Sequence, residues 1–204
     1  MSVLLDVLMS MFLGGMLLLN VLGAQSIVAE DSSTYQGDVL VQEMMISQVQ
    51  YVEGEFRNMG YGLQPGQQTI FSAGDSSISF LIDLGRDGVI DTLKYSVGPT
   101  SELSGTQNEV DKYIHRQVNS QTFTSPAVVT YFHLGYYTVT GDTLIGPVAS
   151  GDLGRIDEVE ITMEVQNPYA LYRAPGSVHA GERNALYSTS YWQQTRLASQ
   201  NFRR

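Results

Sequence analysis

The chain has 204 residues, enough for one domain or for one domain with an extension, and 43% of them are hydrophobic. Its 21 acidic and 11 basic residues give a formal charge of −10, which disfavours binding to nucleic acid or to anionic lipid surfaces. The sequence contains no cysteine, which excludes disulfides, thiolate zinc sites and cysteine nucleophiles, so stability must come from packing or from assembly.

The first 25 residues, MSVLLDVLMSMFLGGMLLLNVLGAQ, are almost continuously apolar and carry one acid, Asp6, and no basic residue. Twenty helical residues rise about 30 Å, the thickness of the hydrocarbon core of a bilayer. Three interpretations fit such a segment: a cleaved signal peptide, a permanent membrane anchor, or a helix that leaves the membrane to become the core of a polymer.

The charge pattern bears on these three interpretations. Small residues after Leu22 are compatible with signal cleavage, but the basic n-region of a signal peptide is missing. An anchor should carry Lys or Arg at one flank, and the first basic residue here is Arg57. We expect that a charged leader precedes Met1 and is removed, leaving an apolar N-terminus with a free α-amine.

This start resembles the mature N-terminus of type IV pilins and type II secretion pseudopilins. In that family a prepilin peptidase cuts just before a hydrophobic helix whose fifth residue is an acid. Asp6 is fifth when counted from Ser2 and sixth when counted from Met1. Either Ser2 or Met1 can therefore be the mature N-terminus. The resemblance implies that Asp6 pairs with the α-amine of a neighbouring subunit. The alternative is that Asp6 lies at headgroup level near the chain end.

Three glycines interrupt the apolar segment: Gly14, Gly15 and Gly23. Glycine inside a helix costs about 0.5–1 kcal/mol relative to alanine, so these positions are candidates for a stretch that loses helix during assembly. The alternative interpretation is that small residues let neighbouring helices approach closely.

Residues 26–60 continue as an amphipathic helix. The apolar side chains of this part recur at steps of three and four, at Val41, Met45, Val49, Val52, Phe56 and Met59. Residues 30–33 and Gly37 are weak points at which the helix is expected to bend or break. Gly60 and Gly62 supply its stop. The phrase EFRNMGYGL at this helix end also resembles minor pilins and pilin-like proteins.

Residues 61–204 predict a β-rich head. Residues 77–83 and 89–97 flank Gly85-Arg86-Asp87-Gly88 and predict a hairpin. Further strands are expected at 113–118, 127–134, 159–166 and 188–196, with a loop at 99–108 and a flexible region near 174–182. The expected fold is therefore α+β: a long N-terminal hydrophobic-then-amphipathic helix packed on an antiparallel β-sheet head, which is also the pilin architecture.

A weak calcium candidate lies in the hairpin turn, where Asp83, Asp87 and Asp91 occupy positions one, five and nine of a loop with glycine at six. Position three is Gly85, and position twelve is Lys94 where a glutamate would be expected. The favoured interpretation is a turn whose aspartates hydrogen-bond their own backbone. No other metal or cofactor site is predicted.

The histidines and aromatic residues give no specific signal. The three histidines, at positions 115, 133 and 179, lack metal-ligand spacing. The hydrolase, P-loop and dinucleotide motifs are missing from the sequence, so no catalytic activity is expected. Four tyrosines in the head are expected to be exposed and are open to two interpretations, subunit contacts or a carbohydrate surface: Tyr136, Tyr137, Tyr169 and Tyr172. Trp192 is expected in a closing strand.

The resemblance implies a structural subunit of an extracellular type IV pilus-like filament that is held in the inner membrane before it polymerises through its N-terminal helix. The implied partners are copies of itself, the prepilin peptidase and the pilus assembly machinery. Two alternatives remain: a minor pilin or pseudopilin that primes a secretion or pilus fibre, and a membrane-anchored adhesion or binding domain that never polymerises.

Overall fold

The computed structural model describes residues 2–105, 110–166, 190–199 and 201. The chain begins with one long helix, α1 (Ser2–Arg57), and continues with strands and two short 3₁₀ helices, η1 (Thr100–Leu103) and η2 (Leu153–Arg155). The chain divides into two compact units, Met1–Leu40 and Val41–Arg204. The sequence places boundaries at 25 and 60, where hydropathy changes and the helix stops. The unit boundary falls inside α1 instead, because packing against the strands begins only near Val41.

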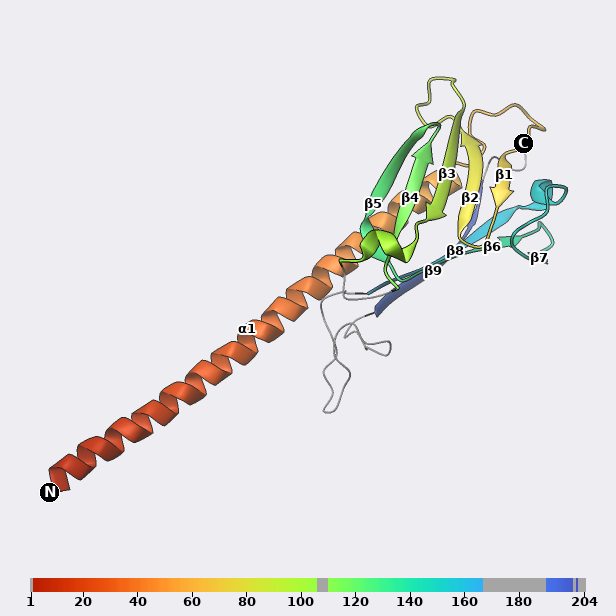
Figure 1. Cartoon of the computed structure of the whole chain (residues 1–204). Helices are drawn as coiled ribbons and strands as arrows, with labels where there is room; N and C mark the ends of the chain where they lie inside the picture. Colours follow the sequence, from red (N-terminus) through yellow and green to blue (C-terminus); the bar gives the residue numbers. More distant parts are fainter. Residues whose placement is uncertain (1, 106–109, 167–189, 200, 202–204) are drawn as a thin grey trace. The chain divides into compact units, whose positions relative to one another are not determined.

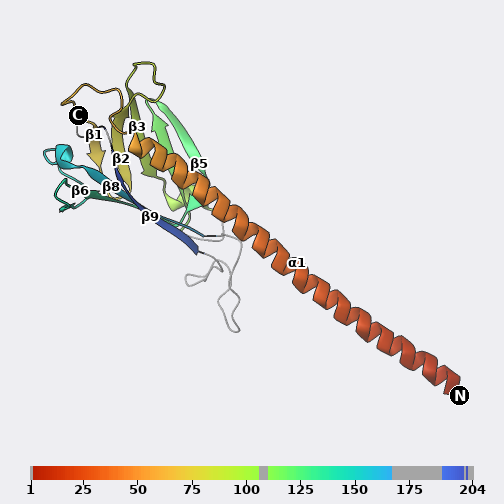
Figure 2. The same cartoon turned by 180° about the vertical axis from the view of Figure 1, so that it is seen from behind.

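Helix α1 is helical at every described position from Ser2 to Arg57 (Figures 1 and 2). The break expected at residues 30–33 and Gly37 is therefore absent from this helix. Side chains bond to the preceding turn along it: Ser10 Oγ donates to the Asp6 carbonyl at 2.8 Å, and Gln36 Nε2 donates to Ser32 Oγ at 3.2 Å. A single weak helix former costs less than 1 kcal/mol, which the neighbouring turns offset.

Glycines terminate the helix as predicted. Gly60 and Gly62 have φ of 76° and 84°, in the left-handed region that glycine adopts without steric cost. The Gly60 amide donates to the Leu81 carbonyl at 2.9 Å, which ties the helix end to the first sheet. A Cβ on Gly62 would lie 2.6 Å from Cβ of Asp83, so the close approach also requires glycine.

The first sheet is an antiparallel meander with strands in the order β1-β2-β3-β4-β5 (Figure 1). Its strands are β1 (Ile70–Ala73), β2 (Ser77–Ile82), β3 (Asp91–Val97), β4 (Lys112–Val118) and β5 (Gln121–Val129). The predicted hairpin is confirmed, because β2 and β3 pair antiparallel from Ser77 with Ser96 to Ile82 with Asp91.

The second sheet has four antiparallel strands in the order β7-β6-β8-β9. Its strands are β6 (Tyr131–Tyr137), β7 (Thr143–Leu144), β8 (Glu158–Gln166) and β9 (Ser190–Ala198). The expected closing strand with Trp192 is confirmed as β9, which pairs along its length with β8. In Figures 1 and 2 the strands β1–β5 and β6–β9 form two separate layers beside the end of α1.

The prediction of one strand over residues 127–134 is wrong. Thr130 separates β5 from β6, and the two strands belong to different sheets. The Thr130 amide donates to the Glu164 carbonyl at 2.9 Å, so the chain begins pairing with β8 at this residue. The expected loop at 99–108 contains η1, and the expected flexible region at 174–182 lies outside the described residues.

The core of the head confirms the α+β class and the apolar stripe of the helix. Met45, Val49, Val52, Phe56 and Met59 are all buried, and Val41 packs against them from the edge. The Phe56 ring meets the rings of Phe80 and Tyr95, with 5.5 Å between centroids in each pair. On the other side, Val49 and Val52 lie against Ile161 and Met163 of β8. The helix stripe therefore fills the space between two sheets rather than covering the face of one.

Candidate functional site

The first part of α1 is the most unusual surface in the described chain. Val3–Ala29 has a mean hydropathy of 2.0 and is long and apolar enough to cross a membrane. Its large apolar side chains are exposed on every side of the helix, from Val3 at 73% to Val28 at 67%. A soluble surface rarely carries a continuous apolar area of this size, which makes the segment a candidate for contact with lipid or with a protein partner.

Asp6 interrupts this apolar surface with an exposed carboxylate in the second turn of the helix. Among the described residues, none donates a hydrogen bond to its side chain, and its carbonyl accepts the Ser10 hydroxyl at 2.8 Å. An unpaired carboxylate is costly in an apolar surrounding and is commonly neutralised by a partner. Ser2 begins the helix, and Met1 lies outside the described residues.

The three glycines of this segment lie on the helix with open space around them. A Cβ built on Gly14, Gly15 or Gly23 would meet no atom within 4 Å. All three residues are helical, so they mark no break in this helix. Both predictions for them, local loss of helix and close approach of a second helix, concern the assembled state and stay predictions.

A buried charged cluster joins the second part of α1 to the first sheet. Glu55 is only 7% exposed, and Arg116 of β4 donates to it through Nε at 3.0 and 3.1 Å and through a terminal nitrogen. The Tyr95 hydroxyl of β3 donates to the same carboxylate. The Arg116 guanidinium also lies over the rings of Tyr51 and Phe123, at 5.4 and 5.8 Å from their centroids.

The electrostatics of this cluster favour one protonation state. Burial raises the pKa of the Tyr95 hydroxyl far above its usual value, and the nearby Glu55 charge raises it further. Burial lowers the pKa of Arg116, but hydrogen bonds and charge from Glu55 outweigh it and raise the pKa overall. The cluster therefore holds a fixed ion pair. Sequence analysis missed it, although the acid Glu55 beside Phe56 in the apolar stripe was a signal.

The calcium candidates bond to the turn that contains them, as the favoured interpretation predicts. Asp83 accepts the amides of Asp87 and Gly88 at 3.1 and 3.0 Å, and Asp87 accepts the amide of Val89 at 2.9 Å. Asp91 accepts the Leu84 amide of this turn at 3.4 Å, and it also accepts the Asn119 side-chain amide at 2.7 Å. Among the described residues, no three His, Cys, Asp or Glu side chains are grouped closely enough to hold a metal ion.

The histidines and tyrosines of the head that the structure describes lie in different surroundings. His115 bonds Glu102 at 2.8 Å, and His133 stacks on Tyr131 with 6.1 Å between ring centroids. The expectation that Tyr136 is exposed is wrong: the ring is fully buried, and its hydroxyl donates to the Gly74 carbonyl at 2.7 Å. Tyr137 is half-buried at the surface. Tyr169, Tyr172 and His179 lie outside the described residues.

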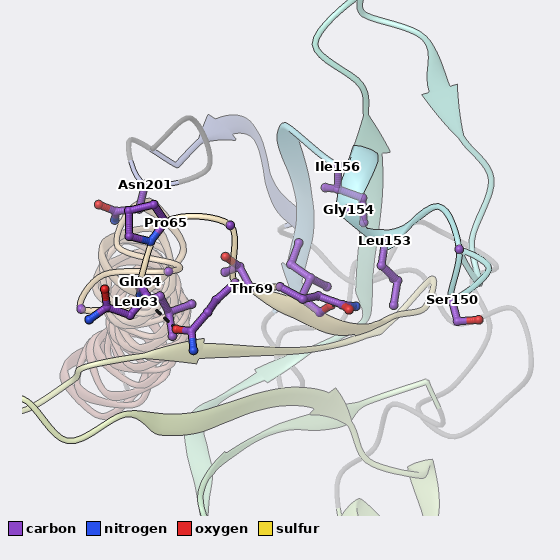
Figure 3. A pocket seen from close by; sticks show the side chains of 16 residues that line it. Leu63, Gln64, Pro65, Thr69, Ser150, Leu153, Gly154, Ile156 and Asn201 are labelled. Carbon is purple, nitrogen blue, oxygen red and sulfur yellow. Dashed lines mark hydrogen bonds between the residues drawn. The ribbon is translucent and has the colours of Figure 1, made fainter.

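A polar hollow of about 430 Å³ lies beside the helix end in the head. Figure 3 shows Gln64, Pro65 and Asn201 on one side of it and Ser150, Leu153 and Ile156 on the other, with Thr69 between them. Its polar groups are partly engaged within the wall, since the Gln67 side chain accepts the Gln64 amide and Asn201 Nδ2 donates to the Met59 carbonyl. Among the described residues, none that lines this hollow is titratable.

Comparisons of the chain with models of protein families, with curated proteins and with solved structures found no match.

Proposed function

We propose that the chain is a structural subunit of an extracellular type IV pilus-like filament, without catalytic activity, that polymerises through Val3–Ala29. The observation that carries the proposal is an apolar helix exposed on every side at the start of a chain whose Val41–Arg204 unit has its own packed core. A membrane alone explains an apolar helix. The carboxylate of Asp6 and the resemblance of the first residues to pilins favour a helix that also has a protein partner.

The proposed route has two states for the apolar helix. Before assembly Val3–Ala29 lies in the inner membrane, and after assembly it lies among copies of itself in the filament. Both surroundings are apolar, so the hydrophobic effect contributes little to the transfer, and helix packing and polar contacts decide which neighbours are accepted. Asp6 then provides the polar contact, by pairing with the α-amine of a neighbouring subunit, and sets the axial register.

The experiment is electron microscopy of material sheared from the surface of cells that make this chain, with immunogold labelling against the head. Long fibres containing this chain alone are the expected result. Labelling only at fibre tips or bases would support a minor pilin or pseudopilin instead. A chain found only in the membrane fraction, without labelled fibres, would favour a membrane-anchored binding domain that does not polymerise.

The role of Asp6 is tested with a matched pair of variants on the same helix. Asp6→Ala is expected to leave membrane insertion intact and to reduce the sheared fibre yield at least about tenfold, because loss of a charge-assisted contact costs ~1.5–3 kcal/mol. Asp31→Ala removes an exposed acid beyond the apolar segment and should leave the yield unchanged. Equal fibre yields from both variants would contradict the proposal that Asp6 sets the axial register of the filament.

A further inference from the structure

The outward face of β6, β8 and β9 is built from four rows of side chains. The pairing gives the rows Tyr131-Glu164-Trp192, His133-Thr162-Gln194, Gly135-Glu160-Arg196 and Tyr137-Glu158-Ala198. Alternating burial along β6 and β8 places the intervening residues in the core and these on the surface. We call this surface the β6–β8–β9 face.

Aromatic rings flank a polar column on this face. Trp192 is 67% exposed and Tyr131 is 49% exposed, in one row on either side of Glu164. Neighbouring strands are about 4.8 Å apart, so the backbones that carry the two rings are roughly 10 Å apart. The middle column, on β8, consists of Glu158, Glu160, Thr162 and Glu164.

The polar groups of the face are held by one another. Gln194 Nε2 donates to Glu160 at 2.7 Å, and the Tyr137 hydroxyl donates to the same carboxylate at 3.3 Å. Arg196 pairs with Glu158 and lies over the Tyr137 ring, 3.6 Å from its centroid. Side chains fixed in this way lose little conformational entropy when a ligand binds.

Gly135 contributes no side chain to the middle of the face. A Cβ there would meet Glu160 and Tyr137 only at ordinary contact distances of 3.4–3.5 Å, so neither packing nor backbone conformation requires glycine. A glycine inside a strand weakens it and often marks a place where a ligand or another backbone approaches closely. Gly135 therefore points to an occupant of this face.

The first sheet shows what a merely solvated face looks like in this protein. Two of its outward rows, Ser79-Lys94-Gln117-Thr122 and Ser77-Ser96-His115-Thr124, consist of hydroxyl, amide, lysine and histidine side chains without a Phe, Tyr or Trp. The first sheet does carry exposed rings elsewhere, at Phe71 and Phe123. The second sheet differs because two rings, Tyr131 and Trp192, lie in one row on either side of a polar column.

Charge and layout restrict the class of ligand. Three glutamates against one arginine make the face unfavourable for nucleic acid and for anionic glycans. Protein interfaces place apolar residues at the centre and polar residues at the rim, whereas this face has its polar column at the centre. Sugar hydroxyls both donate and accept hydrogen bonds, and the C–H faces of sugar rings suit the negative faces of aromatic rings.

We propose that the β6–β8–β9 face binds a neutral oligosaccharide chain. Tyr131 and Trp192 stack on its sugar rings, and Glu160, Thr162 and Gln194 bond its hydroxyls. Gly135 lets the chain lie close to β6. This inference goes beyond the proposed filament and does not depend on it, because all the groups involved belong to the Val41–Arg204 unit.

The test uses the full chain in detergent micelles, with cellohexaose, mannohexaose and xylohexaose as neutral probes and heparin as the anionic probe. Trp192 is the only tryptophan in the sequence, so intrinsic tryptophan fluorescence reports directly on the face. At least one neutral hexaose is expected to change the emission with a saturable dependence that salt does not weaken. Heparin should cause no saturable change.

Variants then locate the binding surface. Tyr131→Ala is expected to weaken binding about tenfold or more. Gly135→Val is expected to abolish it by placing a branched side chain, from a good strand former, where the ligand would lie on the backbone. The matched control is Phe71→Ala, which removes a 53% exposed ring from β1 of the other sheet and should leave the affinity unchanged. Thermal unfolding verifies that each variant is folded. If Gly135→Val does not fold, the comparison of Tyr131→Ala with Phe71→Ala is sufficient to test the proposal.

Two results would overturn the proposal. One is the absence of any emission change with all three neutral hexaoses up to millimolar concentration. The other is a binding curve that Tyr131→Ala and Phe71→Ala leave equally unchanged. Loss of fibres in Tyr131→Ala without sugar binding by the parent chain would assign the face to a subunit contact instead.

Discussion

The two parts of α1 differ in their content of large apolar residues and also in how these residues are distributed around the helix. In Val3–Ala29 they point in every direction and are exposed, whereas in residues 41–57 they form one stripe that ends in the core of the head. A stripe requires one covering surface, which the two sheets provide. A helix that is apolar all round requires an apolar surrounding on all sides. The amount of hydropathy and its pattern together separate the part of the helix that packs in the head from the part whose apolar surface is exposed.

Phe12 and Phe56 provide the sharpest version of this comparison. Phe56→Ala removes a fully buried ring that meets Phe80 and Tyr95, and it is expected to lower the free energy of unfolding of the head by about 4 kcal/mol. Phe12→Ala removes a 66% exposed ring and should change that free energy by less than about 0.5 kcal/mol. Denaturant unfolding in micelles, followed by Trp192 fluorescence, measures both. Equal destabilisation by the two variants would contradict the division of the helix.

The Glu55 cluster predicts the next largest effect. Glu55→Ala leaves the Arg116 guanidinium largely buried without its counter-ion, which is expected to cost about 3 kcal/mol of unfolding free energy. Replacing both partners, in Glu55→Leu/Arg116→Leu, should recover part of this loss because no unpaired charge is then buried. Chemical denaturation of the three variants provides the test. A double variant less stable than Glu55→Ala would show that the ion pair is not the cause.

Two buried tyrosines predict a loss of stability at alkaline pH. Burial raises the pKa of Tyr95 and of Tyr136 above the value of the unfolded chain, and nearby acids raise each further. The folded state therefore holds these protons more tightly, and its advantage is complete below about pH 10 and declines as pH rises further. At pH 11 each tyrosine is expected to cost about 1.4 kcal/mol. Thermal unfolding between pH 8 and 11 should show a shallower decline for Tyr136→Phe than for the parent chain, and identical declines would contradict the assignment.

The turn between β2 and β3 predicts the smallest effect. Asp83→Ala removes the acceptor for the Asp87 and Gly88 amides and is expected to cost about 1 kcal/mol. Because these aspartates serve their own turn, millimolar calcium should leave the melting temperature of the parent chain unchanged. A calcium-dependent rise that Asp83→Ala abolishes would show that the turn is a metal site after all.

Local patterns in the sequence were sufficient for the helix and for several strands. The steps of three and four from Val41 to Met59, the glycines at 60 and 62, and the hairpin around Gly85–Gly88 are each decided by neighbouring residues, and the structure confirms them. The apolar N-terminal segment is likewise evident from composition alone.

The features that the sequence analysis missed depend on distant residues. Glu55 is buried because Arg116 and Tyr95 meet it from 61 and 40 positions away, which no local spacing reveals. The break at Thr130 arises because β6 pairs with β8 of another sheet, and the short β1 and β7 lack a strand-length apolar pattern. Tyr136 and Tyr137 are adjacent residues of the same type, and only the alternation of burial within β6 places Tyr136 in the core and Tyr137 at the surface.

The most direct test of the central claim asks what surrounds each part of α1 in assembled material. The absence of native cysteine allows a clean scan of single cysteines through residues 11–19, together with Val49→Cys in the buried stripe. After mild oxidation of sheared fibres, some positions within 11–19 are expected to give cross-linked dimers, and Val49→Cys should give none. The same positions should give no dimers when the fibres are dissolved in detergent before the oxidation. Disulfides form only where Cα atoms lie within about 7 Å, so the positive positions identify helix contacts. Fibres without cross-links at any of these positions, or cross-links only at Val49→Cys, would contradict assembly through the apolar helix.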